Sequence, residues 1–212
     1  MRTIVRTLLG LGLVALLASP AAAQGRGRMM GGNLAFLITN ESVQKELKLD
    51  DKQVDKAKDL AEKSREEMQE KFQGFQDLSP EERRTKGQEI MRELNASILK
   101  SAGEFLKPEQ ITRLKQISYQ QRGATAFLDP EVQKKLNLSD SQKSQIQALI
   151  QESFSQMPSR EEFQDDREAA MKKMREVSKK TLTQAEAKLN DEQQKTWKEL
   201  LGSPFEVKYE TQ

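Results

Sequence analysis

Acidic side chains are the residues in this sequence whose type could take part in acid–base chemistry. They occur as neighbouring pairs at Glu66-Glu67, Glu81-Glu82 and Asp165-Asp166. General acid–base catalysis needs a carboxyl group whose pKa is tuned by its surroundings, and nothing around these pairs singles one out. The sequence has no histidine and no cysteine, so imidazole and thiol chemistry are absent, and no G-x-x-x-x-G-K phosphate loop occurs. We therefore expect no enzymatic activity, no catalytic residue and no cofactor.

Metal binding is the second kind of chemistry to consider. Zinc and nickel are borderline-soft ions that proteins hold with imidazole or thiolate ligands, and this chain has neither. A hard cation would accept carboxylates, but no loop carries the regular series of oxygen ligands that such a site needs. The sequence therefore predicts no metal site.

A Leu-x-x-x-Gln pattern occurs four times. Its second position is an aspartate, a lysine, a serine and an asparagine in turn, and three of these four are good helix N-caps. A glutamine three residues after an N-cap can accept a hydrogen bond from the backbone N–H of the cap residue. We therefore interpret the pattern as a device that starts helices, in preference to a binding site. The pairs are Leu49 with Gln53, Leu106 with Gln110, Leu138 with Gln142, and Leu189 with Gln193.

The elements that carry this pattern are predicted to be helices. Apolar residues recur at steps of three, four or seven over 53–76 and over 82–105, which is typical of amphipathic helices. Between them, Ser79 offers an N-cap, Pro80 suits the first helical position, and Glu82 completes a capping box. The two long helices should therefore form an antiparallel hairpin. Shorter helices are predicted on either side of it, over 42–48 and 108–121.

This unit occurs twice. "VQKELKLDDKQ" at 43–53 returns as "VQKKLNLSDSQ" at 132–142, a spacing of 89 residues, and "LKPEQ" at 106–110 returns as "LNDEQ" at 189–193, a spacing of 83. The second copy is therefore six residues shorter, near the turn of its hairpin. Pro158-Ser159 and Asp165-Asp166 compete for the position of that turn. The sequence predicts an all-α tandem duplication, with repeats over 34–122 and 123–201.

The two ends of the chain differ from the repeats. Arg2 and Arg6, an apolar run over 8–18 and the triplet at 21–23 predict a signal peptide over 1–23, cleaved near Ala23, and export to the periplasm. A Gly-rich linker should follow over 24–33. Without the leader the chain has 33 basic and 33 acidic residues. This balance of charge predicts that nucleic acid is not a partner. No apolar run long enough to span a membrane remains. The tail over 202–212 alternates Phe205, Val207 and Tyr209, and either docks on the helices or hangs free.

The repeated pattern, its position around a hairpin and the leader resemble the LTxxQ-motif family of bacterial envelope proteins, which includes the Spy and CpxP types. The motif positions hold "LDDKQ", "LKPEQ", "LSDSQ" and "LNDEQ", and "SPEERR" at 79–84 resembles the hairpin turn of the family. No copy has threonine at the second position. The resemblance covers 40–121 and 129–201. It implies hairpins that pair as a shallow cradle, here as a single-chain pseudo-dimer, with a homodimer of two-copy chains as the alternative.

The resemblance implies a holdase chaperone that binds non-native envelope proteins without ATP. The alternatives are a CpxP-like regulator bound to the periplasmic domain of a stress sensor kinase, a metal-responsive periplasmic protein, and a helical spacer. A holdase needs a surface that is both apolar and charged, and methionine suits such surfaces. The alternative location for each apolar candidate is the hydrophobic core of its hairpin. The candidate client-binding residues are Met68, Phe72, Phe75, Arg83, Arg84 and Met91 in the first repeat, and Phe154, Met157, Phe163 and Met171 in the second.

Overall fold

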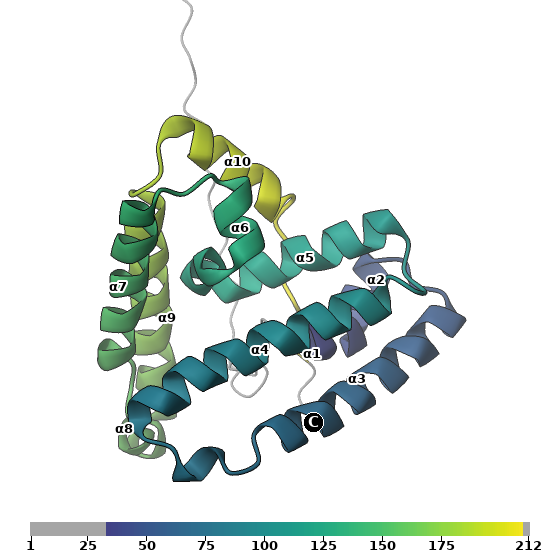
Figure 1. The fold of residues 1–212 in the computed structure, drawn as a ribbon, viewed down its shortest axis with the longest axis horizontal. Helices are drawn as coiled ribbons and strands as arrows, with labels where there is room; N and C mark the ends of the chain where they lie inside the picture. Colours follow the sequence, from purple (N-terminus) through teal and green to yellow (C-terminus); the bar gives the residue numbers. More distant parts are fainter. Residues whose placement is uncertain (1–32, 210–212) are drawn as a thin grey trace, which may run out of the picture.

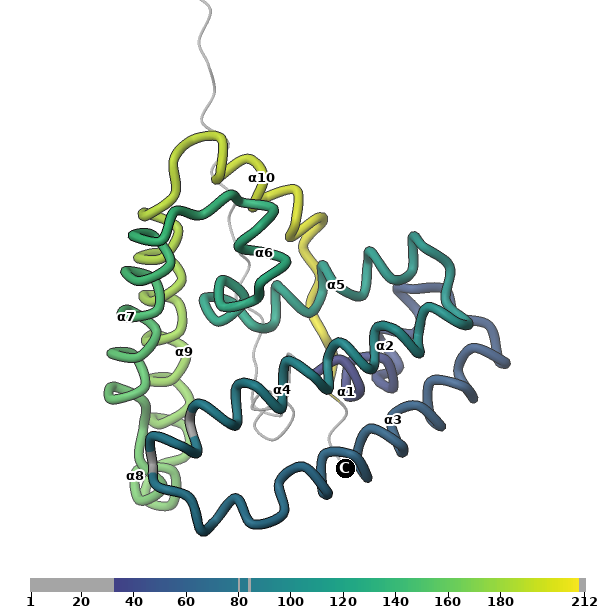
Figure 2. The backbone as a smooth tube through the Cα atoms, in the orientation of Figure 1, coloured from purple at the N-terminus to yellow at the C-terminus, as the bar shows by residue number. Residues whose placement is uncertain are grey.

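The structure is a computed structural model that describes residues 33–209, without the side chains of Pro80 and Arg84 (Figure 2). The predicted signal peptide, residues 24–32 of the linker and the last three residues lie outside this range. The described chain is all-α, as predicted, and no strand occurs within it (Figure 1). The first half contains α1 (Leu34–Thr39), α2 (Glu41–Glu46), α3 (Asp51–Lys71), the 3-10 turn η2 (Phe75–Asp77), α4 (Pro80–Ala102) and α5 (Pro108–Arg122). The second half contains η3 (Gly123–Leu128), α6 (Pro130–Lys135), α7 (Asp140–Gln156), α8 (Arg160–Asp165), α9 (Arg167–Glu186) and α10 (Asp191–Leu201).

Two pairs of long helices dominate the molecule: α3 packs on α4, and α7 packs on α9 (Figure 1). The predicted start of α4 is confirmed, because Ser79 Oγ accepts from Glu82 N at 3.3 Å and Glu82 Oε2 accepts from Ser79 N at 2.9 Å. The first long helix ends at Lys71, so its predicted extension to residue 76 is wrong. Gly74 adopts a positive φ of 73° there, a conformation that glycine adopts without a steric penalty, and the chain turns through η2.

Both competing turn positions of the second repeat are used. Ser159 caps α8 and Asp166 caps α9, so a short helix separates the ends of α7 and α9. The two N-caps satisfy backbone N–H groups that a helix start otherwise leaves unpaired. The sequence offered two valid helix starts, and the chain forms both.

The repeated sequences adopt the same local structure. Lys48 and Asn137, which are 89 residues apart, both have a positive φ, of 52° and 48°. Gln44 and Gln133 each donate a side-chain N–H to a carbonyl of the preceding helical segment, at 3.0 and 2.9 Å. The short segments before each hairpin therefore end in the same way.

Each half of the chain has its own hydrophobic cluster. The first is built from α1 to α5 with Val207 of the tail, and the second from η3, α6, α7, α9 and α10. Helix α5 joins them, because Leu114 and Ile117 belong to the first cluster while Tyr119 belongs to the second. Trp197 is 2% exposed and packs against Phe127, with ring centroids 4.4 Å apart. None of the helices between residues 33 and 209 has the length and apolar content needed to cross a bilayer.

Candidate functional site

The four motif glutamines form two pairs. Gln53 and Gln110 donate to each other's side-chain oxygen at 2.9 and 3.2 Å, and Gln142 and Gln193 do so at 2.7 and 3.1 Å. Each oxygen also accepts the backbone N–H of its own N-cap residue, as predicted. Three of the N-cap side chains complete the box. Lys107 does not, because an ammonium group cannot accept a hydrogen bond.

The remaining N–H of each amide is also used. It donates to a backbone carbonyl of the opposite helix-capping loop, so the donors and the oxygen of each amide are already engaged in hydrogen bonds within the protein. The motif therefore ties the start of α3 to that of α5, and the start of α7 to that of α10. Leu106, Leu138 and Leu189 beside them are buried, and Leu49 is half-buried. The carbonyl contacts are Gln53 to Phe105 at 2.9 Å, Gln110 to Leu47 at 3.0 Å, Gln142 to Lys188 at 2.8 Å and Gln193 to Asn137 at 3.3 Å.

The apolar candidates of the first repeat lie at the turn end of the α3–α4 pair. Met68, Phe72, Phe75 and Met91 are all half-buried, and none belongs to either hydrophobic cluster. Phe72 and Phe75 are in edge contact, with centroids 4.7 Å apart. The Phe75 ring lies close to Gly87 of α4, where an added Cβ would come within 3.3 Å of it. These side chains therefore cover the turn and leave part of their surface to solvent.

Charged groups surround this apolar turn. Arg83 is exposed, whereas the side chain of Arg84 lies outside the described part of the structure. Lys71 pairs with Glu93 across the hairpin at 2.9 Å. The hydrogen bond and the charge attraction raise the pKa of Lys71 and lower the pKa of Glu93, so both groups stay charged at neutral pH. The turn end thus combines apolar surface with fixed charges.

The second repeat has a similar turn end. Phe154 is 52% exposed, and no other large hydrophobic side chain among the described residues is exposed to this extent. Met157, Phe163 and Met171 are half-buried around α8 and lie outside both clusters. Glu162 accepts from Lys173 Nζ at 2.6 Å, and that bond lowers the pKa of Glu162. Figure 1 draws both turn ends at the lower left of the view.

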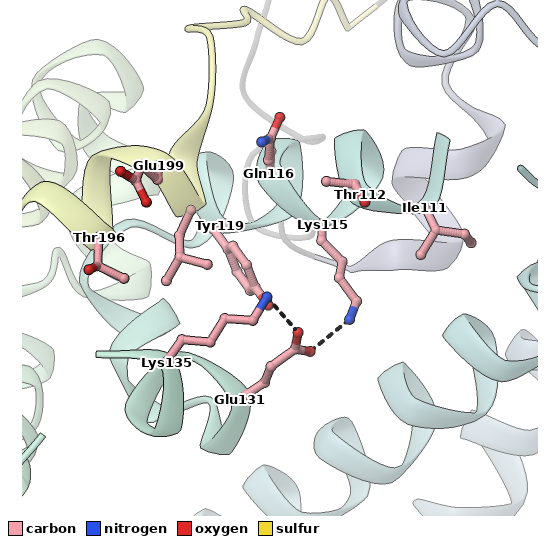
Figure 3. Close-up of a pocket in the computed structure, with 10 residues that line it drawn as sticks. Ile111, Thr112, Lys115, Gln116, Tyr119, Glu131, Lys135, Thr196 and Glu199 are labelled. Carbon is pink, nitrogen blue, oxygen red and sulfur yellow. Dashed lines mark hydrogen bonds and ion pairs between the residues drawn. The ribbon is translucent and has the colours of Figure 1, made fainter. Parts of the chain in front are cut away.

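A cavity of about 410 Å³ lies where α5, α6 and α10 meet. The carboxylate of Glu131 accepts from Lys115 at 2.7 Å and from Lys135 at 3.1 Å, and Figure 3 shows the two lysines reaching it from different helices. Burial alone would raise the pKa of Glu131, but the two lysines together hold it below its ordinary value. Burial raises the pKa of Tyr119, helped by the nearby charges of Glu131 and Asp129, so the phenol stays protonated. At this cavity the Glu131 carboxylate is therefore already paired with two lysines, and the Tyr119 phenol does not act as a base.

Sequence reasoning missed this cavity because α10, which forms one of its walls, is far from α5 and α6 in the chain. The lining residues are Ile111, Thr112, Lys115, Gln116 and Tyr119 of α5, Glu131 and Lys135 of α6, and Thr196, Glu199 and Leu200 of α10.

Within residues 33–209, no three Asp or Glu side chains are grouped in a way that could hold a metal ion. Comparison with protein-family models, with curated proteins and with solved structures gives no match for this chain.

Proposed function

We propose that the chain is an exported, ATP-independent holdase that binds non-native proteins through the turn ends of its two helical pairs. One observation carries the proposal: phenylalanine and methionine side chains at both ends stay outside the two hydrophobic clusters and keep contact with solvent. Leaving apolar area in water forgoes about 25 cal/mol per Å² of stabilisation. Apolar side chains that are grouped on a surface, unlike scattered ones, are typical of a site that binds a partner.

The chemistry of the turn ends suits non-native clients. Methionine adapts to many apolar partners, and phenylalanine gives a large contact area. Fixed charges such as the Lys71–Glu93 and Lys173–Glu162 pairs keep the same surface hydrated. Weak, sequence-tolerant binding of exposed apolar segments follows from this mixture.

We propose that the chain consists of two LTxxQ-type units that pair as a single-chain pseudo-dimer. The equivalent glutamine pairs, the equivalent left-handed residues Lys48 and Asn137, and the packing of α5 on α10 support it. A native mass measurement of the mature chain should give a monomer. A stable dimer would instead favour a cradle made by two chains.

Light scattering of a chemically unfolded client diluted into buffer tests the holdase function. The mature chain, without nucleotide, should suppress aggregation in proportion to its concentration, up to a few-fold molar excess. An unrelated helical protein of the same size and net charge is the control. Absence of suppression at that excess overturns the proposal, and capture of one folded sensor domain in place of unfolded clients would replace it with the regulatory alternative.

A further inference from the structure

The tail after Gly202 lies on the first repeat as an extended segment. Figure 1 shows it leaving α10 and running past α5 towards α1. Side chains alternate along it, as the sequence predicted: Val207 is 2% exposed, Phe205 and Tyr209 are half-buried, and Glu206 and Lys208 face solvent. The tail therefore presents one apolar face to the helices and one charged face to water.

Side chains of the helices satisfy the backbone of this segment. Around Lys208, Asn40 Nδ2 donates to the carbonyl at 2.8 Å and Ser42 Oγ accepts from the N–H at 3.0 Å. Around Phe205, Gln120 Oε1 accepts from the N–H at 2.9 Å. Gln120 Nε2 and Arg113 Nη1 both donate to the carbonyl of Ser203 at 2.8 Å. These contacts recognise main-chain groups and are therefore indifferent to the sequence of the segment.

Three apolar side chains of the tail contact the helices. Val207 is part of the first hydrophobic cluster. The guanidinium of Arg113 lies over the Phe205 ring at 5.9 Å from its centroid. Tyr209 stacks on Phe36 with centroids 5.8 Å apart, and its hydroxyl donates to Gln121 at 3.1 Å. The surface that contacts the tail, here called the groove, is formed by Phe36, Asn40, Ser42, Arg113, Gln120 and Gln121. The tail places apolar side chains on it at alternate positions, with rings at the two ends.

The second repeat has no equivalent groove. The residue that corresponds to Asn40 is Asp129, which caps its helix in the same way but has no N–H to donate. Asp129 instead forms an ion pair with Arg122 at 2.8 Å. The residue that corresponds to Phe36 is Thr125, which offers no ring. The groove on α1, α2 and α5 is therefore a property of the first repeat alone.

We propose that this groove is a binding site for an extended polypeptide segment with apolar residues at alternate positions, and that the tail of the chain fills it as a resident ligand. The clients are strand-like segments of non-native proteins, which enter when the tail leaves. This assignment of clients rests on the proposed holdase function. The tail then limits access to the groove, while the turn ends remain open at all times.

Fluorescence anisotropy of a labelled peptide covering residues 203–209 tests the groove directly. The peptide should bind a chain truncated after Gly202 and should bind the full chain about tenfold more weakly, because a tethered tail competes at an effective concentration near millimolar. A peptide carrying Val207→Asp is the control and should not bind. A truncated chain that keeps cooperative unfolding yet binds no peptide overturns the proposal.

Two further variants keep the test decisive if truncation prevents folding. The full chain with Val207→Asp should release its tail and bind the wild-type peptide about tenfold more tightly than the unaltered chain does, and no gain would count against the groove. Asn40→Asp copies the second repeat and keeps the helix cap while removing one donor. In a chain that also carries Val207→Asp, this change should weaken binding of the wild-type peptide roughly tenfold. One hydrogen bond is lost, and two oxygens are left facing each other.

The assignment of clients has its own test. A permanently unfolded, carboxymethylated protein should displace the labelled peptide from the tail-released chain. If the peptide binds but is not displaced, the groove is a docking site for the tail alone and the assignment of clients is wrong. The holdase proposal is judged separately, by light scattering with the full chain, so the two failures are distinguishable.

Discussion

Gln53 and Gln110 donate side-chain N–H groups to each other across 57 residues of sequence, while the oxygen of each caps its own helix. This double role requires a group that both donates and accepts, which an amide provides and a carboxylate does not. The hairpin turns show the contrast. There, Glu82 and Glu162 complete capping boxes with Ser79 and Ser159. Glutamine stands where a helix start has to be tied to a second one.

Gln110→Glu should therefore destabilise the fold although glutamate is a good capping-box residue. The substitution removes the donors to Gln53 and to the Leu47 carbonyl, and it places a carboxylate against both oxygens. The expected loss in the free energy of unfolding is about 1–3 kcal/mol, measured by urea denaturation at neutral pH. Glu82→Gln is the matched control in a box without an amide partner, and it should leave stability close to wild type. Equal effects of the two changes would mean that the amide pair contributes nothing.

Lys48→Gly should stabilise the chain. Lys48 has φ of 52°, and a left-handed conformation costs a residue with a Cβ about 1–2 kcal/mol. Glycine avoids that cost but loses about 0.5–1 kcal/mol through the greater freedom of the unfolded chain, which leaves a gain of roughly 0.5–1 kcal/mol. Asn137→Gly, at the equivalent position of the second repeat, should gain less because asparagine tolerates this conformation. A thermal melt of both variants checks the order, and a larger gain at Asn137 would contradict it.

Glu131 should make stability depend on pH. Its pKa in the folded protein lies below the ordinary value of 4.5, because Lys115 and Lys135 outweigh its burial. The group therefore contributes stability that is fully present above about pH 4.5 and is lost as the pH falls through the folded pKa. Glu131→Gln should lower Tm most at pH 7, and the difference from wild type should shrink on acidification to pH 3. Glu109→Gln, at an exposed position of α5, is the control. A difference that does not change with pH would contradict the ion-pair explanation.

Local chemistry explains what could be predicted from the sequence. The start of α4 at Ser79, Pro80 and Glu82 was predictable because all the residues of a capping box lie within four consecutive positions. The tail alternation at Phe205, Val207 and Tyr209 was visible for the same reason. The end of α3 was not, since Gly74 and the packing of Phe75 on α4 stop the helix while the apolar spacing continues. A helix-like spacing states which side chains share a face, but not where the chain leaves the helix.

Long-range contacts account for the rest. The glutamine pairs, the groove for the tail and the cavity around Glu131 each join residues from helices that no local pattern connects. One signal for the pairs was available: four glutamines occupied equivalent places, two in each repeat. A capping role explains each of them singly, so the pattern did not require a partner. Only the folded chain, in which Gln53 and Gln110 are hydrogen-bonded to each other, shows that the starts of α3 and α5 meet.

Phe154→Ser separates binding from folding at the turn end of the second repeat. Because the side chain is 52% exposed and lies outside both clusters, the change should alter the free energy of unfolding by no more than about 0.5 kcal/mol. If the turn ends bind clients, the same change should weaken suppression of aggregation, and a double variant that adds Met157→Ser should weaken it further. Gln147→Ser, at an exposed position two turns earlier on α7, is the matched control and should have no effect. Full suppression by the Phe154 variant would show that clients contact a different surface of the molecule.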